Sequence, residues 1–220
     1  MRAFYIAATL SLLCAAPSLA QDEHGYITAV GGFATSTDAT SGNVLFDAGV
    51  RVAPHLLVFG NLGQFHNLQP SDALPAVDST MATVAGSIGL NVIGTARVPA
   101  LYSVGGVRYE MPTRARISPY VSAGLGVARL SPTAQFTYSS GILPDGTTPI
   151  AGTDVTSELV TAGYFTTPPA TNAFMYTLGG GVDIPVAHHW AVDVGYRFSR
   201  VEADTPLNAQ GMTFGFGYRF

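Results

Sequence analysis

The stretch Trp190–Ser199, WAVDVGYRFS, alternates between two kinds of side chain over its whole length. The large apolar and aromatic side chains occupy every second position: Trp190, Val192, Val194, Tyr196 and Phe198. The small, polar or charged side chains occupy the positions between them: Ala191, Asp193, Gly195, Arg197 and Ser199. Because side chains point alternately to the two faces of a strand, this pattern predicts a β-strand with one apolar face and one polar face.

The last stretch of the chain, 212–220, MTFGFGYRF, has the same alternation. Phe214, Phe216, Tyr218 and Phe220 fall on one face, opposite Gly215, Gly217 and Arg219. An arginine that faced acyl chains near the middle of a bilayer would cost about 2–4 kcal/mol. The aromatic faces are therefore assigned to lipid and the polar faces to a filled interior, with Trp190, Tyr218 and Phe220 near the periplasmic interface.

Six further stretches carry strand signals, bounded by Pro, Asn, Asp and Gly. They are 26–33, 44–52, 56–65, 101–109, 120–129 and 174–184. Short connections follow the second, fourth and sixth of the eight strands, and longer ones follow the others. This predicts an all-β fold, a transmembrane antiparallel up-and-down β-barrel with short periplasmic turns and long extracellular loops. The loops 66–100 and 131–171 are rich in Ser, Thr, Pro and Gly, and we expect them to be mobile at the cell surface.

The composition agrees with a membrane protein that has no spanning helix. Charged residues make up 11% of the 220 residues, against about a quarter in soluble domains. The most apolar stretch after the N-terminal region, 81–101, contains Asn91, Arg97 and several glycines and prolines. A closed barrel is the other architecture that satisfies every backbone hydrogen bond within lipid.

The N-terminus has the features of an export signal. Arg2 precedes an apolar run, 3–16, and Ser18-Leu19-Ala20 offers small residues to signal peptidase. We expect cleavage after Ala20, which leaves 21–220 as one outer-membrane barrel domain. Cys14, the single cysteine, would leave with the signal, so a disulfide or thiolate metal site is not expected.

Carrying the alternation around the barrel places seven charged side chains in the lumen. They are Asp47, Arg51, Arg108, Asp183, Asp193, Arg197 and Arg219. Unpaired charges in so narrow a space would be costly, which predicts a connected Arg/Asp network. The network is interpreted as a polar plug, with a proton or ion path as the alternative. The sequence does not say which residues pair.

The final strand also carries a resemblance. Its terminal aromatic residue, with aromatics at alternate positions before it, is similar to the signal read by the barrel-assembly machinery of Gram-negative bacteria, here Phe216, Tyr218 and Phe220. With the signal peptide and eight strands, the mature chain resembles the small barrels of the OmpA/OmpX and opacity-protein type. The resemblance implies an outer-membrane location and this assembly route, and it extends to adhesion or host contact through loops.

An enzymatic reading has little support from the residues. Lipid A deacylases of similar size place His and Ser together near the outer end of a late strand, but the stretch 196–200 offers Ser199 without a histidine. A serine without a base is not activated. His188 and His189 lie in a predicted turn, and His66 precedes Asp72 and Asp78 in a loop. No catalytic residue, metal or cofactor is expected.

The sequence thus predicts a non-enzymatic outer-membrane surface protein that supports envelope integrity and contacts a host or surface ligand through its loops. The alternatives are a narrow channel for small or hydrophobic solutes and a lipid A-modifying enzyme. The expected partners are outer-membrane lipid, lipopolysaccharide and the barrel-assembly machinery. Nucleic acid is not expected, because the net charge is −4 and the arginines are scattered.

Overall fold

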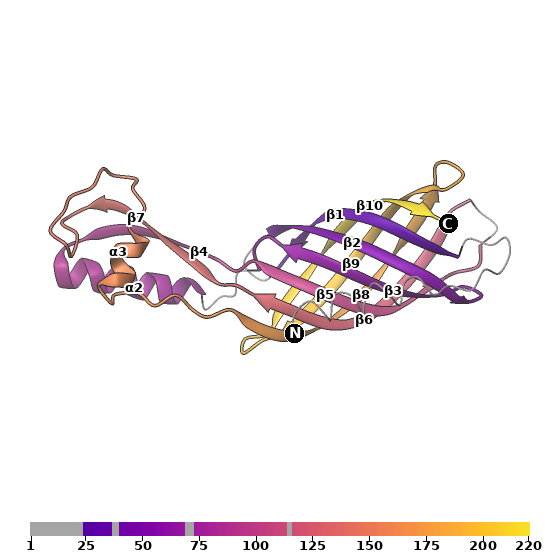
Figure 1. Cartoon of the computed structure of the whole chain (residues 1–220), viewed down its shortest axis with the longest axis horizontal. Helices are drawn as coiled ribbons and strands as arrows, with labels where there is room; N and C mark the ends of the chain where they lie inside the picture. Colours follow the sequence, from indigo (N-terminus) through magenta and orange to yellow (C-terminus); the bar gives the residue numbers. More distant parts are fainter. Residues whose placement is uncertain (1–23, 37–39, 69–72, 114–115) are drawn as a thin grey trace, which may run out of the picture.

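The computed structural model describes residues 24–36, 40–68, 73–113 and 116–220. The proposed signal peptide, 1–20, and its cleavage site lie outside these residues. In the described part of the chain, eight strands close into a barrel (Figure 1). They are β1 (Gly25–Thr35), β2 (Thr40–Ala53), β3 (Leu56–Phe65), β5 (Ala100–Glu110), β6 (Ser118–Leu130), β8 (Thr171–Pro185), β9 (Trp190–Glu202) and β10 (Leu207–Arg219).

The barrel has the predicted up-and-down topology. Its strand order is β1-β10-β9-β8-β6-β5-β3-β2, and every neighbouring pair is antiparallel. The closing pair joins the first and last strands of the barrel, with Tyr26 opposite Arg219 and Ile27 opposite Tyr218. The all-β fold class and the eight-stranded barrel are confirmed.

The observed strands are longer than predicted at their extracellular ends. β1 and β2 continue until Thr35 pairs with Thr40, and β9 and β10 continue until Val201 pairs with Leu207. The prediction of four long extracellular connections was therefore wrong. Only four residues of sequence separate β1 from β2, and four separate β9 from β10, because the Ser, Thr, Asn and Gln residues that suggested loops pair as the ends of strands.

The outer face of the barrel is the apolar face that the alternation assigned to lipid. Phe46, Leu125 and Phe216 are more than half exposed. Trp190 stacks on Phe216 with ring centroids 4.9 Å apart, and Tyr218 meets Trp190 edge-on at 5.3 Å. Such aromatic side chains are enriched at the interface between lipid and water.

The Phe46→Arg substitution tests the face assignment, because Phe46 lies midway along β2 and is 65% exposed. We expect it to lower the free energy of unfolding by about 2–4 kcal/mol. Val52→Arg, on the same face but at the periplasmic end of β2, should cost about 0–1 kcal/mol. Urea unfolding in phospholipid vesicles measures both. Equal costs for the two variants would contradict the assignment.

Two of the extracellular connections fold into a separate body that projects from one end of the barrel (Figure 1). We call it the lobe. It contains α2 (Ala73–Ile88), β4 (Asn91–Arg97), β7 (Thr133–Ser140) and α3 (Thr156–Thr161). β4 and β7 form their own two-stranded antiparallel sheet. Neither helix in the described part of the chain is long and apolar enough to cross a membrane.

The lobe overturns the expectation that loops 66–100 and 131–171 are mobile surface segments. Val77, Val84 and Ile88 recur at helical spacing along α2 and pack toward the sheet. A Cβ at Gly94 would overlap the Val77 side chain, so glycine permits the close approach of α2 to β4. Gly89, with φ of +66°, then ends the helix in a conformation that favours glycine.

The lobe has its own apolar core, which explains why it is ordered. Its buried members are Val77, Val84, Leu90, Val92, Phe136, Tyr138, Leu143, Val155, Leu159 and Phe165. Phe136 and Phe165 meet edge-on with ring centroids 5.0 Å apart. These residues come from both long connections, so neither connection forms this core alone.

Candidate functional site

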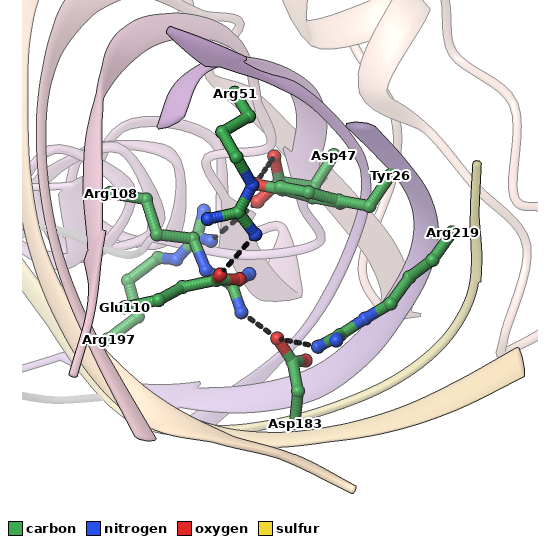
Figure 2. A network of polar contacts seen from close by, with 8 residues as sticks. All are labelled: Tyr26, Asp47, Arg51, Arg108, Glu110, Asp183, Arg197 and Arg219. Atoms are coloured by element: carbon green, nitrogen blue, oxygen red, sulfur yellow. Dashed lines mark hydrogen bonds and ion pairs between the residues drawn. The ribbon is translucent and has the colours of Figure 1, made fainter. Parts of the chain in front are cut away.

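The structure places all seven charged side chains predicted for the lumen on the inner face of the barrel (Figure 2 labels six of them). They come from five strands that surround the lumen: β2, β5, β8, β9 and β10. Asp47, Arg108, Asp183 and Asp193 are buried. Arg51, Arg197 and Arg219 are partly buried.

Asp183 lies at the centre of the largest cluster. Its Oδ2 accepts from Nη2 of Arg108, across the lumen on β5, and lies 2.8 Å from Nη2 of Arg219 on β10. The Arg108 guanidinium also lies over the ring of Tyr120, 3.5 Å from its centroid. Asp193 is the cross-strand neighbour of Asp183, so two carboxylates and two guanidiniums gather in one part of the lumen. Opposite charges offset the cost of burying each of them.

Asp47 forms a second cluster on the opposite wall (Figure 2). The Tyr26 hydroxyl donates to Oδ1 of Asp47 at 3.1 Å, and Nη2 of Arg197 donates to Oδ2 at 3.4 Å. Arg108 links this cluster to the first, because its guanidinium also lies 4.9 Å from the centroid of the Tyr26 ring. The charged side chains thus span the lumen from β2 to β8.

Sequence reasoning missed one acid of the network. Nη2 of Arg51 donates to Oε2 of Glu110 at 2.7 Å. The predicted strand ended at Tyr109, one residue before Glu110. Continuing the alternation by two residues from Arg108 would have found it. With Glu110, four arginines face four acids in the lumen among the residues that the structure describes, whereas the sequence had suggested four and three. Tyr26 and Tyr120 were missed as well.

Toward the extracellular mouth, the lumen is filled by apolar side chains. Phe65 and Tyr102 pack with ring centroids 4.8 Å apart, and Leu45 and Met175 are fully buried beside them in one cluster. Leu68 belongs to the same cluster and its N–H donates to the Val98 carbonyl at 2.8 Å. Leu68 and Val98 lie near the two ends of the connection that carries α2. The base of the lobe therefore closes the extracellular mouth of the barrel.

A cavity of about 380 Å³ lies between the lobe and the barrel mouth. Its walls come from α2, the end of β4, the β6–β7 connection, the segment before β8 and the β9–β10 turn. Apolar side chains dominate them, among them Val77, Leu130, Phe165 and Leu207. Arg97 and Asp204 are the charged residues among its lining. The sequence contained no motif for this cavity, because its walls are up to about 130 residues apart in the chain.

The remaining described residues that were singled out from the sequence do not gather in one site. Ser199 is buried on the inner face of β9. His188 and His189 occupy the β8–β9 turn, and His66 follows β3 at the other end of the barrel. Within the residues that the structure describes, no group of three or more His, Cys, Asp or Glu side chains could hold a metal ion. Asp72 lies outside the described residues, and Asp78 is exposed on α2.

Phe216, Tyr218 and Phe220, the proposed assembly signal, point outward and are 52%, 39% and 49% exposed. The residue that follows β10 is tied to the start of β1, because the Phe220 carbonyl accepts from the Gly25 N–H at 2.9 Å. The residues of the proposed signal therefore lie along the seam where β10 meets β1.

A closed eight-stranded barrel with an apolar outer belt, a filled lumen and short turns at one end defines a small outer-membrane β-barrel protein. Comparison with family sequence models identifies the family. The model of the outer membrane protein beta-barrel domain matches residues 6–220, and the chain belongs to this family. The family implies the outer membrane as the location. Comparison with curated protein sequences finds no match.

Solved structures of small outer-membrane barrels have a similar fold. Neisserial surface protein A superposes with a TM-score of 0.52 at 15% identity, over 90% of this chain and 96% of that one. Ail, the attachment invasion locus protein of Yersinia pestis, gives 0.47 at 12% identity, over 90% and 100%. OprG of Pseudomonas aeruginosa gives 0.47 at 11%, over 91% and 97%. The first of these similarities supports the fold alone, because the identity is low.

Proposed function

We propose that this protein is a non-enzymatic surface protein whose barrel is a closed anchor and whose lobe contacts molecules outside the cell. One observation carries the proposal: two connections distant in sequence fold together into an ordered lobe with its own core. Ordering so many residues costs conformational entropy. A loop that only joins two strands can stay unordered and does not have this cost. An ordered lobe presents a fixed surface to a partner.

The filled lumen supports an anchor rather than a channel. Eight strands enclose a space just wide enough for side chains. Here those side chains are an ion-pair network followed by an apolar layer. An ion that left the charged part of the lumen would have to pass the tightly packed side chains of Leu45, Phe65 and Met175, and these apolar side chains cannot replace its water.

Planar-bilayer recordings of the purified protein test the closed lumen. We expect no stepwise conductance, because the ion pairs and the apolar layer together block the route. The variant Arg51→Ala, which removes one side chain from the periplasmic end of the lumen, should also be silent because the apolar layer remains. Discrete channels in the unmodified protein would support the narrow-channel alternative instead.

Contact through the lobe is tested on whole cells. A non-adherent Gram-negative host would express either the full chain or a variant in which 69–97 and 133–170 are replaced by short Gly/Ser turns. Adherence to cultured epithelial monolayers is counted for both, after equal surface levels have been verified. We expect adherence from the full chain only. Equal adherence of the two strains would refute a contact role for the lobe, and a changed lipid A mass spectrum would favour the enzyme alternative.

We further propose that lipopolysaccharide and phospholipid surround the barrel and that the barrel-assembly machinery inserts it. The apolar belt supports the first part. The outward aromatic row Phe216, Tyr218 and Phe220 supports the second, because it lies on the terminal strand that closes the barrel.

A further inference from the structure

We propose that the cavity between the lobe and the barrel mouth binds a single-chain amphiphile with an anionic end, of the fatty-acid type. The inference goes beyond the proposed function, because a lobe that only presents a surface needs no cavity beneath it. The volume of about 380 Å³ falls within the range of about 300–1,000 Å³ that is typical of small-molecule sites.

The walls of the cavity suit an acyl chain. Val77 and Phe165 come from the core of the lobe, and Leu130 and Leu207 come from the apolar layer of the barrel. All four side chains are less than a tenth exposed. Burying an apolar chain against such walls contributes about 25 cal/mol for each square ångström removed from water.

The floor of the cavity indicates binding rather than passage. Leu130, Leu207 and Val98 line the cavity and also belong to the apolar cluster that contains Phe65, Tyr102 and Met175 at the extracellular mouth of the lumen. An acyl chain that entered the cavity from the lobe side would therefore stop against packed side chains. The charged half of the barrel lies beyond them.

Arg97 supplies the charge that selects an anionic end. Its backbone is held in β4 opposite Thr133, whose hydroxyl donates to the Arg97 carbonyl at 3.3 Å. Among the described residues, no acid forms an ion pair with its guanidinium, which is exposed at the cavity rim. A guanidinium binds a carboxylate or phosphate through charge-assisted hydrogen bonds.

Two acids lie near enough to matter for the choice of ligand. Asp154 shares a polar depression with Arg97, but its carboxylate is already engaged by the Thr156 hydroxyl at 2.6 Å and by the Gln135 amide at 3.0 Å. The Thr156 hydrogen bonds hold the pKa of Asp154 below its usual value. Asp204 lines the cavity itself, in the exposed β9–β10 turn. The negative charge of Asp204 disfavours an anionic ligand in the cavity. The positive charge of Arg97, which is held on β4, favours one.

The test uses the whole protein in phospholipid nanodiscs free of detergent, with radiolabelled decanoate as the probe and empty nanodiscs as the background. We expect saturable binding of one decanoate per chain. Arg97→Gln should weaken binding about tenfold, the loss expected for one charge-assisted hydrogen bond. Asp204→Asn should strengthen it. The matched control Arg129→Gln, an exposed arginine outside the cavity lining, should leave binding unchanged.

Further variants and competitors distinguish binding at this site from general partitioning of decanoate into lipid. Thr171→Trp should block the cavity from an exposed position, whereas Ile150→Trp, at an exposed site outside the cavity lining, should not. Decyl phosphate should compete with decanoate if the site accepts anionic heads in general. Binding equal to that of empty nanodiscs, equal affinities of Arg97→Gln and Arg129→Gln, or a preference for decyltrimethylammonium would overturn the proposal. None of these outcomes depends on the conductance or adherence results.

Discussion

Asp183→Asn is expected to lower the free energy of unfolding of the barrel by about 3–5 kcal/mol, the usual cost of removing one partner from a buried ion pair. Asp183 is 6% exposed and is the carboxylate that Arg108 and Arg219 share. Its loss leaves the buried Arg108 charge without its closest acid. Urea unfolding in phospholipid vesicles measures the change, with Trp190, the single tryptophan, as the fluorescent reporter.

The matched control is Asp78→Asn, which makes the same chemical change at an exposed position on α2. It should shift the unfolding free energy by less than about 0.5 kcal/mol. The double variant Asp183→Asn with Arg108→Met should recover part of the loss, because a buried pair can be replaced by apolar groups at little cost. If Asp183→Asn were as stable as Asp78→Asn, the shared ion pairs of Asp183 would contribute nothing measurable to the stability of the barrel.

Phe136→Ala is expected to unfold the lobe while the barrel stays intact. Phe136 lies on β7 and is fully buried against Phe165 and Gly94 of β4. Truncating a buried phenylalanine costs about 3–5 kcal/mol, and this core is small. Trypsin and chymotrypsin, added to protein in sealed vesicles, should cut the lobe of the variant quickly. The barrel should keep its different gel mobility with and without boiling.

Ile150→Ala provides the comparison for this experiment, since Ile150 is 84% exposed and belongs to neither core. Its lobe should resist protease as the unmodified lobe does. Loss of the barrel band in Phe136→Ala would mean that the lobe and the barrel fold as one unit, contrary to the two separate cores.

The barrel could be predicted from the sequence because lipid imposes a simple rule on it. Each strand shows one face to acyl chains and one to a narrow lumen, so stretches such as 190–199 alternate along their whole length. The same rule located the seven luminal charges by parity. It could not pair them, because pairing depends on strand register and on reach across the lumen, as from Arg108 to Asp183.

The lobe could not be predicted by this rule. Its helix α2 is rich in Ala, Ser and Thr, and its apolar side chains face a sheet whose second strand, β7, comes from another part of the chain. Val77 and Phe165 become core residues only after the two connections meet. The cavity is even harder to predict from the sequence, because Arg97 and Asp204 lie on different elements and share no motif.

Cysteine labelling on intact cells determines whether a closed barrel displays the lobe outside the cell. Ile150→Cys marks the lobe, and Ala187→Cys marks the turn between β8 and β9 at the opposite end of the barrel. A maleimide too polar to cross the outer membrane should label Ile150→Cys on intact cells and Ala187→Cys only after permeabilisation. Labelling of Ala187→Cys on intact cells, with Ile150→Cys protected, would contradict the account.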